Sequence, residues 1–158
     1  MLVLYRVDDR LVHGQVAEGW VPHLKADELA VVSDEIAADP LRRDIMRFAT
    51  PEGVDLRIMT VEQAAEYLPQ AETSARKVLL LLPGLAEALA LLGRGMKFTS
   101  LNIGGMHYSA GKNLSIGKAI FLNDEDCAAL KALAAAGIKI EGRGVPSDTP
   151  LDLLGAIA

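Results

Sequence analysis

Met1-Leu2-Val3-Leu4-Tyr5 begins the chain and is followed at once by Arg6-Val7-Asp8-Asp9-Arg10-Leu11-Val12-His13-Gly14-Gln15. An almost unbroken apolar run of this kind is typical of a strand buried on both faces of a parallel sheet. The charges begin abruptly at Arg6, where we expect a loop to follow the strand. Apolar residues then recur at helical spacing, at Val16, Trp20 and Leu24. The opening stretch therefore predicts strand, loop and helix in that order.

The rest of the chain repeats this alternation. Apolar runs predict further strands over 28–32, 54–59, 78–82, 98–103, 119–122 and 138–140, with 119–122 at an edge or antiparallel. N-cap residues, capping boxes and helical spacing predict helices that begin near residues 40, 60, 85, 123 and 149. At least five strand–helix alternations indicate right-handed βαβ units. We expect one α/β domain, residues 1–158, with an open, mostly parallel sheet of about six to seven strands and helices on both faces.

One predicted helix has clear start and stop signals. Asp39 is a suitable N-cap and Pro40 a suitable first helical residue. Leu41, Ile45 and Phe48 then recur at helical spacing before the turn at 51–53. Arg42 therefore falls in the first turn of this helix.

The composition excludes several classes of function. The chain has 158 residues, 51% of them hydrophobic and only 4% aromatic, so we expect a core of Leu, Ala, Val and Ile. Its net charge of −5, without a cluster of Lys and Arg, argues against a nucleic-acid or acidic-membrane partner. Cys127 is the only cysteine, which fits a reducing compartment. The N-terminus carries no targeting pattern and no segment is apolar enough to span a membrane, so we expect a soluble, unprocessed cytoplasmic protein.

Ligands of such sheets bind at the carboxyl ends of the strands, where the strand order reverses. Loops beginning at Arg6, Ser33 and Gly104 leave such ends and are expected to converge there. The pair Gly104-Gly105 permits a close approach of the backbone that a side chain would block. Neither the dinucleotide fingerprint nor the Walker loop follows any strand, so no nucleotide is implied.

His13 is the strongest candidate for chemistry. It is expected at a helix N-terminus, where the free N–H groups near Gly14 and Gln15 and the guanidinium of Arg10 suit an anion. An imidazole carries a phosphoryl group covalently when one ring nitrogen is free and the other is held in the correct tautomer. Asp8, Asp9 or a backbone carbonyl is expected to hold it.

These residues also have other interpretations. Arg10 is alternatively a surface arginine paired with a nearby carboxylate, and Arg42 an exposed helix residue. A zinc site that joins His13 to His23 and His107 has no recognisable ligand spacing, so we expect surface histidines and no metal. A noncovalent anion-binding domain is a further alternative.

The run from Arg6 to Val16, with Trp20 after it, resembles the signature of the enzyme IIB component of the mannose/fructose/sorbose class of the bacterial phosphoenolpyruvate-dependent sugar phosphotransferase system. The likeness spans the whole chain. Further landmarks follow in the right order: 31–35 with Arg42, then 100–106, then 145–148.

The resemblance implies that His13 accepts a phosphoryl group on Nδ1 from a phosphohistidine of a IIA protein. It then passes the group to a sugar hydroxyl held by membrane IIC and IID subunits, at the inner face of the membrane. It implies that Arg10 serves onward transfer, that Arg42 is a second active-site arginine, and that no metal or nucleotide is used. The residues expected to act on the phosphoryl group are catalytic His13, Arg10, Arg42 and Asp8, and phosphate-binding Gly14, Gln15, Gly104 and Gly105.

No IIA domain is recognised in the sequence, so we expect the donor to be a separate protein. A regulatory phosphohistidine module without sugar transport is the alternative function. The identity of the sugar and a homo-oligomeric state are left open.

Overall fold

β1 (Leu2–Asp8) lies inside a six-stranded sheet of order β3-β2-β4-β1-β5-β8. The structure is a computed structural model that describes residues 1–158. The other strands of the sheet are β2 (Glu28–Val32), β3 (Asp55–Met59), β4 (Val78–Leu82), β5 (Ser100–Gly105) and β8 (Lys139–Gly142). All five neighbouring pairs are parallel, which confirms the predicted sheet.

A second, two-stranded sheet pairs β6 (Leu114–Ile116) with β7 (Ile120–Leu122). The pairing is antiparallel, as predicted for residues 119–122. The strand order of the large sheet reverses at β1: β2, β3 and β4 lie on one side of it, and β5 and β8 lie on the other. The carboxyl end of β1 is therefore at the switch point where ligands of such sheets bind.

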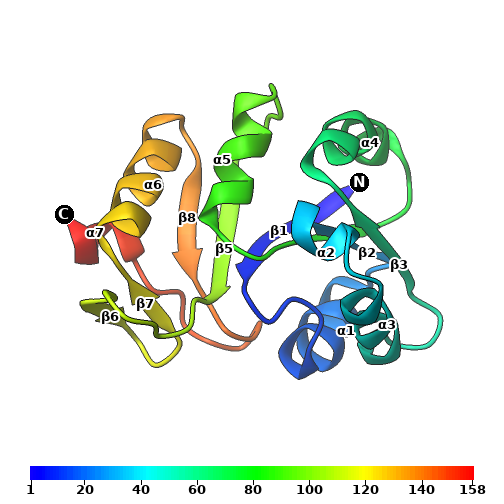
Figure 1. The fold of residues 1–158 in the computed structure, drawn as a ribbon, viewed down its shortest axis with the longest axis horizontal. Coiled ribbons are helices and arrows are strands. Elements are labelled where there is room, and N and C mark those ends of the chain that lie inside the picture. Colours follow the sequence, from blue (N-terminus) through cyan, green and yellow to red (C-terminus); the bar gives the residue numbers. More distant parts are fainter.

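Helices cover both faces of the sheet (Figure 1). On one side lie α4 (Val61–Thr73), α5 (Leu85–Gly93) and α6 (Asp124–Ala135), with the short α7 (Leu153–Ile157) beside β8. On the other lie η1 (Gln15–Trp20), α1 (Val21–Leu24), α2 (Asp34–Ala37) and α3 (Pro40–Ala49). Two buried hydrophobic clusters, of 26 and 12 residues, correspond to these two layers.

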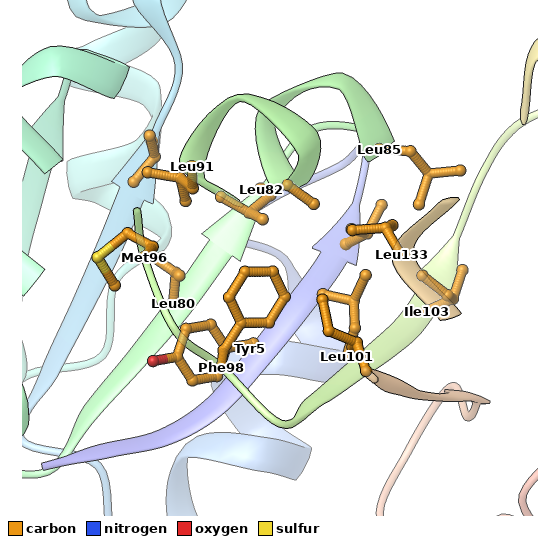
Figure 2. Packing of buried hydrophobic residues seen from close by; sticks show 14 of the residues in the cluster. Tyr5, Leu80, Leu82, Leu85, Leu91, Met96, Phe98, Leu101, Ile103 and Leu133 are labelled. Carbon is orange, nitrogen blue, oxygen red and sulfur yellow. The ribbon is translucent and has the colours of Figure 1, made fainter. Parts of the chain in front are cut away.

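The larger cluster contains few aromatic rings, as the composition predicted. Figure 2 shows Tyr5 stacked on Phe98 beside the side chains of β4, and their ring centroids are 4.9 Å apart. Leu80 and Leu82 are fully buried there. Burial of many branched aliphatic side chains is the main favourable contribution to the stability of such a fold.

Three predicted helix starts are confirmed by their capping contacts. The Asp39 carboxylate accepts hydrogen bonds from the N–H groups of Leu41 and Arg42. Thr60 and Asn123 each form a complete capping box with the residue three positions later. These side chains satisfy backbone donors that have no partner inside the helix.

Several elements differ from the sequence prediction. β5 runs over Ser100–Gly105 and not 98–103, so Gly104 lies in a strand and not in a loop. β1 continues to Asp8, because the charged side chains of Arg6 and Asp8 neutralise each other inside the sheet. The first helix begins as a π-helical stretch over 15–20, and a separate short helix, α2, precedes α3. The terminal helix begins at Leu153 because its cap is Asp152 and not Thr149.

The apolar stripe of α3 faces solvent. Leu41, Ile45 and Phe48 are 70%, 58% and 94% exposed, and Met46 is the only buried residue of the helix. The helix itself is confirmed, but the usual inference that such a stripe packs on the core is wrong here.

Candidate functional site

The Asp8 carboxylate is the centre of a buried polar cluster at the carboxyl end of β1. Asp8 is fully buried, yet both of its oxygens accept hydrogen bonds. Oδ1 accepts from the backbone N–H of Arg10 at 3.1 Å and from its Nε at 3.2 Å. Oδ2 accepts from Nη2 of Arg6 at 3.0 Å and from Nη2 of Arg10 at 3.2 Å. The carboxylate is therefore held by two guanidinium groups.

His13 makes a third contact with this carboxylate. Its Nε2 lies 2.9 Å from Oδ2 of Asp8, and 16% of its side chain is exposed. Nδ1 has no hydrogen-bond partner in the protein. An ionised carboxylate only accepts hydrogen bonds, so Nε2 carries the proton and the lone pair of the neutral ring lies on Nδ1.

The Asp8 carboxyl is ionised at neutral pH. Burial raises the pKa of this group, but hydrogen bonds from His13 and Arg10 and the charge on Arg6 outweigh burial and hold the pKa well below its usual range. The geometry also separates the alternatives for orienting His13. Asp9 instead accepts from the backbone and ring of His107, so Asp8 is the residue that holds His13.

Arg10 extends from this carboxylate toward solvent. Its Nη2 also donates to Oε1 of Gln15 at 2.9 Å, and about a third of its side chain is exposed. Nη1 has no partner within the protein. Nε and Nη2 of Arg10 are thus fixed by hydrogen bonds, and Nη1 is left to donate to a ligand. An arginine that only formed a surface ion pair would not need this arrangement.

Backbone donors lie beside His13. The N–H groups of Val16 and Ala17 both donate to the carbonyl oxygen of His13, where η1 begins. The N–H groups of His13, Gly14 and Gln15 donate no hydrogen bond within the chain. A Cβ placed on Gly14 would meet nothing within 4 Å, so the space there is open. Free N–H groups at a helix N-terminus suit an anion.

Gly104 and Gly105 permit close approaches, as predicted, but the groups that approach are arginines. A Cβ on Gly104 would lie 1.9 Å from Nη2 of Arg6, and a Cβ on Gly105 would lie 3.2 Å from Nη2 of Arg10. Gly104 also lines a cavity of about 430 Å³ with Gln15 and Arg143. Phosphate binding by the two glycines stays a prediction.

Arg42 lies at the same carboxyl edge but not against His13. Its Nη1 lies 3.4 Å from Oε1 of Glu35, and it lines a cavity of about 370 Å³ with Ser33 and Glu87. None of its hydrogen bonds reaches His13, Arg10 or Asp8. The structure therefore brings together His13, Arg10, Asp8, Gly14 and Gln15 and leaves Arg42 apart.

The remaining histidines lie outside this cluster. His107 is exposed and pairs with Asp9, and His23 packs edge-on against Trp20 with ring centroids 6.2 Å apart. The structure contains no group of three His, Cys, Asp or Glu side chains arranged to hold a metal ion. None of its helices is both long and apolar enough to cross a membrane.

Arg6 is the site residue that sequence reasoning missed. The sequence predicts a loop at Arg6, whereas the structure places Arg6 in β1, fully buried against Asp8. The available signal was an arginine two residues before an aspartate at a strand end, together with a Gly-Gly pair on another strand.

Comparison with known proteins gives consistent matches over the whole chain. Residues 2–158 match the family model described as the PTS system sorbose subfamily IIB component. The chain is 35% identical over 157 residues to the PTS system sorbose-specific EIIB component of Lacticaseibacillus casei, covering 99% of this chain and 95% of that protein. It is 34% identical over 155 residues to the mannose-specific EIIAB component of Escherichia coli K12. This alignment covers 98% of the chain but only 48%, about half, of the length of that relative.

Solved structures give the same result. The IIBSor domain of the sorbose permease from Klebsiella pneumoniae superposes with a TM-score of 0.90 at 31% identity, covering 99% of this chain and 96% of that one. The N-acetylgalactosamine-specific IIB component 1 from Escherichia coli also has a TM-score of 0.90, at 28% identity, covering 97% of this chain and 99% of that one.

Proposed function

The chain belongs to the sorbose subfamily of IIB components of the sugar phosphotransferase system, and we propose that it is a phosphocarrier in sugar uptake whose acceptor atom is Nδ1 of His13. The observation that carries this proposal is the contact between Nε2 of His13 and the buried Asp8 carboxylate. It leaves the free lone pair of the ring on Nδ1, and Arg10, which has an unpartnered donor, binds the same carboxylate.

The proposed step is a displacement at phosphorus. The Nδ1 lone pair forms the new N–P bond while the donor's N–P bond breaks, and that electron pair returns to the donor nitrogen. The proton on Nε2 stays in its hydrogen bond to Asp8. The ring of His13 gains positive character as the bond forms, and the Asp8 carboxylate stabilises it at 2.9 Å.

Arg10 and the helix N-terminus stabilise the phosphoryl oxygens in this proposal. Charge in phosphoryl transfer spreads over these oxygens, and preorganised donors provide most of the catalysis. Nη1 of Arg10 and the N–H groups of Gly14 and Gln15 are the donors left without partners. Arg42 is proposed as a second arginine that acts on the phosphoryl group once a partner protein is bound. The step requires no metal or nucleotide.

The proposed partners follow from the family and the chemistry. The donor is the phosphohistidine of a IIA protein, and the relative named EIIAB joins two components in one chain. The acceptor is a sugar hydroxyl presented by membrane IIC and IID subunits, so the protein works in the cytoplasm, peripheral to the inner face of the membrane. Transfer between proteins requires an accessible histidine, and the His13 side chain is partly exposed.

The test is phosphorylation of the purified protein by phosphoenolpyruvate, the general phosphotransferase proteins and the cognate IIA. We expect an acid-labile phosphate on the wild type and none on His13→Ala, while the matched variant His23→Ala is labelled like the wild type. Labelling of His13→Ala at the normal level would refute the proposal. Addition of membranes that contain IIC and IID should then move the phosphate to sugar. Phosphorylated protein that never does so would instead support a regulatory module.

A further inference from the structure

Arg6 occupies a slot that two strands build for it. Its side chain is fully buried in β1, and its Nη2 reaches Asp8 at 3.0 Å. The place for the guanidinium exists because β5 has Gly104 alongside, where a Cβ would lie 1.9 Å from Nη2 and 2.1 Å from Cζ. Any other residue at position 104 would displace the arginine.

The same guanidinium connects the site to three other parts of the fold. Nη1 donates to Oδ1 of Asn102 in β5 and, at 2.9 Å, to the carbonyl of Arg143 after β8. Nη2 also donates to the carbonyl of Gly144 at 3.0 Å. That carbonyl accepts a second bond, from Nε1 of Trp20, whose ring centroid lies 5.4 Å from Cζ of Arg6. Both terminal nitrogens of Arg6 are thus fixed by hydrogen bonds.

Stability alone does not explain a cation in this position. Desolvation by burial lowers the pKa of the Arg6 guanidinium, which means that its charged form is penalised, and Nε is buried without a partner. Buried ion pairs are often no better for folding than apolar side chains of similar volume. A functional role explains the buried cation: Arg6 fixes the Asp8 carboxylate, and that carboxylate acts on His13.

The charge balance among Arg6, Asp8 and Arg10 indicates the role of Arg6. With Arg6 absent, Arg10 would be the only cation on Asp8, and its charge would be used to balance the carboxylate. With Arg6 present, the Arg6–Asp8 pair is neutral in sum, so the positive charge of Arg10 remains available to phosphoryl oxygens. Arg6 also holds the Oδ2 atom that contacts Nε2 of His13.

We propose that Arg6 is a positioning residue of phosphoryl transfer, which fixes and neutralises Asp8 so that His13 presents Nδ1 alone and Arg10 keeps its charge for the phosphoryl group. This inference rests on the proposed function of His13. It assigns Arg6 no contact with the phosphoryl group, and it assigns Gly104 the role of leaving room for Arg6.

The test compares Arg6→Lys, Gly104→Ala and Leu130→Ala with the wild type. Lysine keeps the charge but not the planar fork that reaches Asp8, Asn102 and the loop carbonyls together. Leu130 is buried in α6 on the opposite layer, so its truncation destabilises the fold without touching the cluster. Each protein, labelled with ¹⁵N-histidine, is phosphorylated through phosphoenolpyruvate, the general proteins and IIA. Phosphorus–nitrogen NMR then identifies the phosphorylated nitrogen.

We expect Nδ1-phosphohistidine alone in the wild type and in Leu130→Ala, at equal rates per folded molecule. Arg6→Lys should be phosphorylated about 10- to 100-fold more slowly, the size of effect seen when a partner that orients a metal-ligating histidine or carboxylate is lost. It should also yield some Nε2-phosphohistidine, because the ring is no longer held. Gly104→Ala should also slow phosphorylation and yield some Nε2-phosphohistidine. If Arg6→Lys does not fold, Gly104→Ala tests the positioning role in its place.

A folded Arg6 or Gly104 variant with the wild-type rate and only the Nδ1 product would overturn the positioning role and leave the proposed function intact. The same losses in Leu130→Ala would overturn it too, because stability would then explain them. A wild type with no phosphate on His13 would refute the proposed function itself.

Discussion

The carboxyl end of β1 and the outer face of α3 both reverse the usual distribution of residues. β1 buries Arg6 and Asp8 completely, whereas α3 exposes 70% of Leu41 and 94% of Phe48. The buried charges are paired with each other and with backbone carbonyls. The exposed apolar side chains have nothing in the chain to pack against. The difference shows that partners within the fold, rather than hydropathy, decide which side chains are buried in these two regions.

The two regions also differ in what holds them. The β1 cluster depends on side-chain hydrogen bonds. Nε of Arg6 is buried without a hydrogen-bond partner, and an unsatisfied buried donor typically costs about 1–3 kcal/mol of stability. The α3 helix depends on its cap at Asp39 and on the buried side chain of Met46. Substitutions should therefore act strongly on the first region and weakly on the outer face of the second.

The largest effect is expected from Asp8→Ala. It leaves the Arg6 guanidinium buried without its counter-charge, a change that typically costs about 3–5 kcal/mol of stability. The free energy of unfolding, measured in denaturant, reports this loss, and labelling of His13 should also fail. A variant as stable as the wild type would show that the β1 cluster contributes no more than the face of α3.

The pH dependence isolates the same carboxylate. The folded-state pKa of Asp8 is lowered from the ordinary value of 3.8, so its contribution to stability is fully present above that value. The contribution is lost as the pH falls below 3.8 toward the folded-state pKa. The unfolding free energy of the wild type should therefore decrease in this acid range more steeply than that of Asp8→Asn. Equal slopes for both proteins would mean that Asp8 titrates normally.

Arg10→Lys should separate accepting the phosphoryl group from delivering it. A lysine retains the charge near His13 but cannot bind Asp8, Gln15 and phosphoryl oxygens through one planar fork. Loss of a hydrogen bond to a charged group costs about 1.5–3 kcal/mol, so delivery should slow about 10- to 150-fold. Sugar phosphorylation by membranes that contain IIC and IID measures delivery. Unchanged delivery would remove Arg10 from the mechanism.

The smallest effect is expected on the outer face of α3. Ile45→Ser and Phe48→Ser should change the unfolding free energy by no more than about 0.5 kcal/mol, as is usual for exposed side chains. Met46→Ala on the buried side of the same helix is the matched control and should cost about 2–5 kcal/mol. A large loss from either serine variant would mean that the exposed stripe is packed in solution.

The sheet could be predicted because buried parallel strands have a simple pattern. Val78 to Leu82 is an uninterrupted apolar run, and it forms β4 with the predicted bounds. Helix starts at Asp39, Thr60 and Asn123 could be predicted because capping is local chemistry. The exposure of Phe48 could not, because spacing shows which residues share a helix face but not whether another element covers that face.

The candidate site could be predicted only in part. His13, Arg10 and Asp8 lie within six residues of one another, so their proximity was readable from the sequence. The burial of Arg6 depends on Gly104, almost a hundred residues away in the chain and adjacent only after β1 and β5 pair. The separation of Arg42 from His13 likewise depends on where α3 lies against the sheet, which no local pattern encodes.

Phosphorus–nitrogen NMR on the phosphorylated wild-type protein, with its histidines labelled with ¹⁵N, tests the role of His13 most directly. The Asp8 carboxylate holds Nε2 of His13, so we expect one phosphohistidine whose phosphorus is bonded to Nδ1 while Nε2 keeps its proton. Phosphorus on Nε2, or on any residue other than His13, would contradict it.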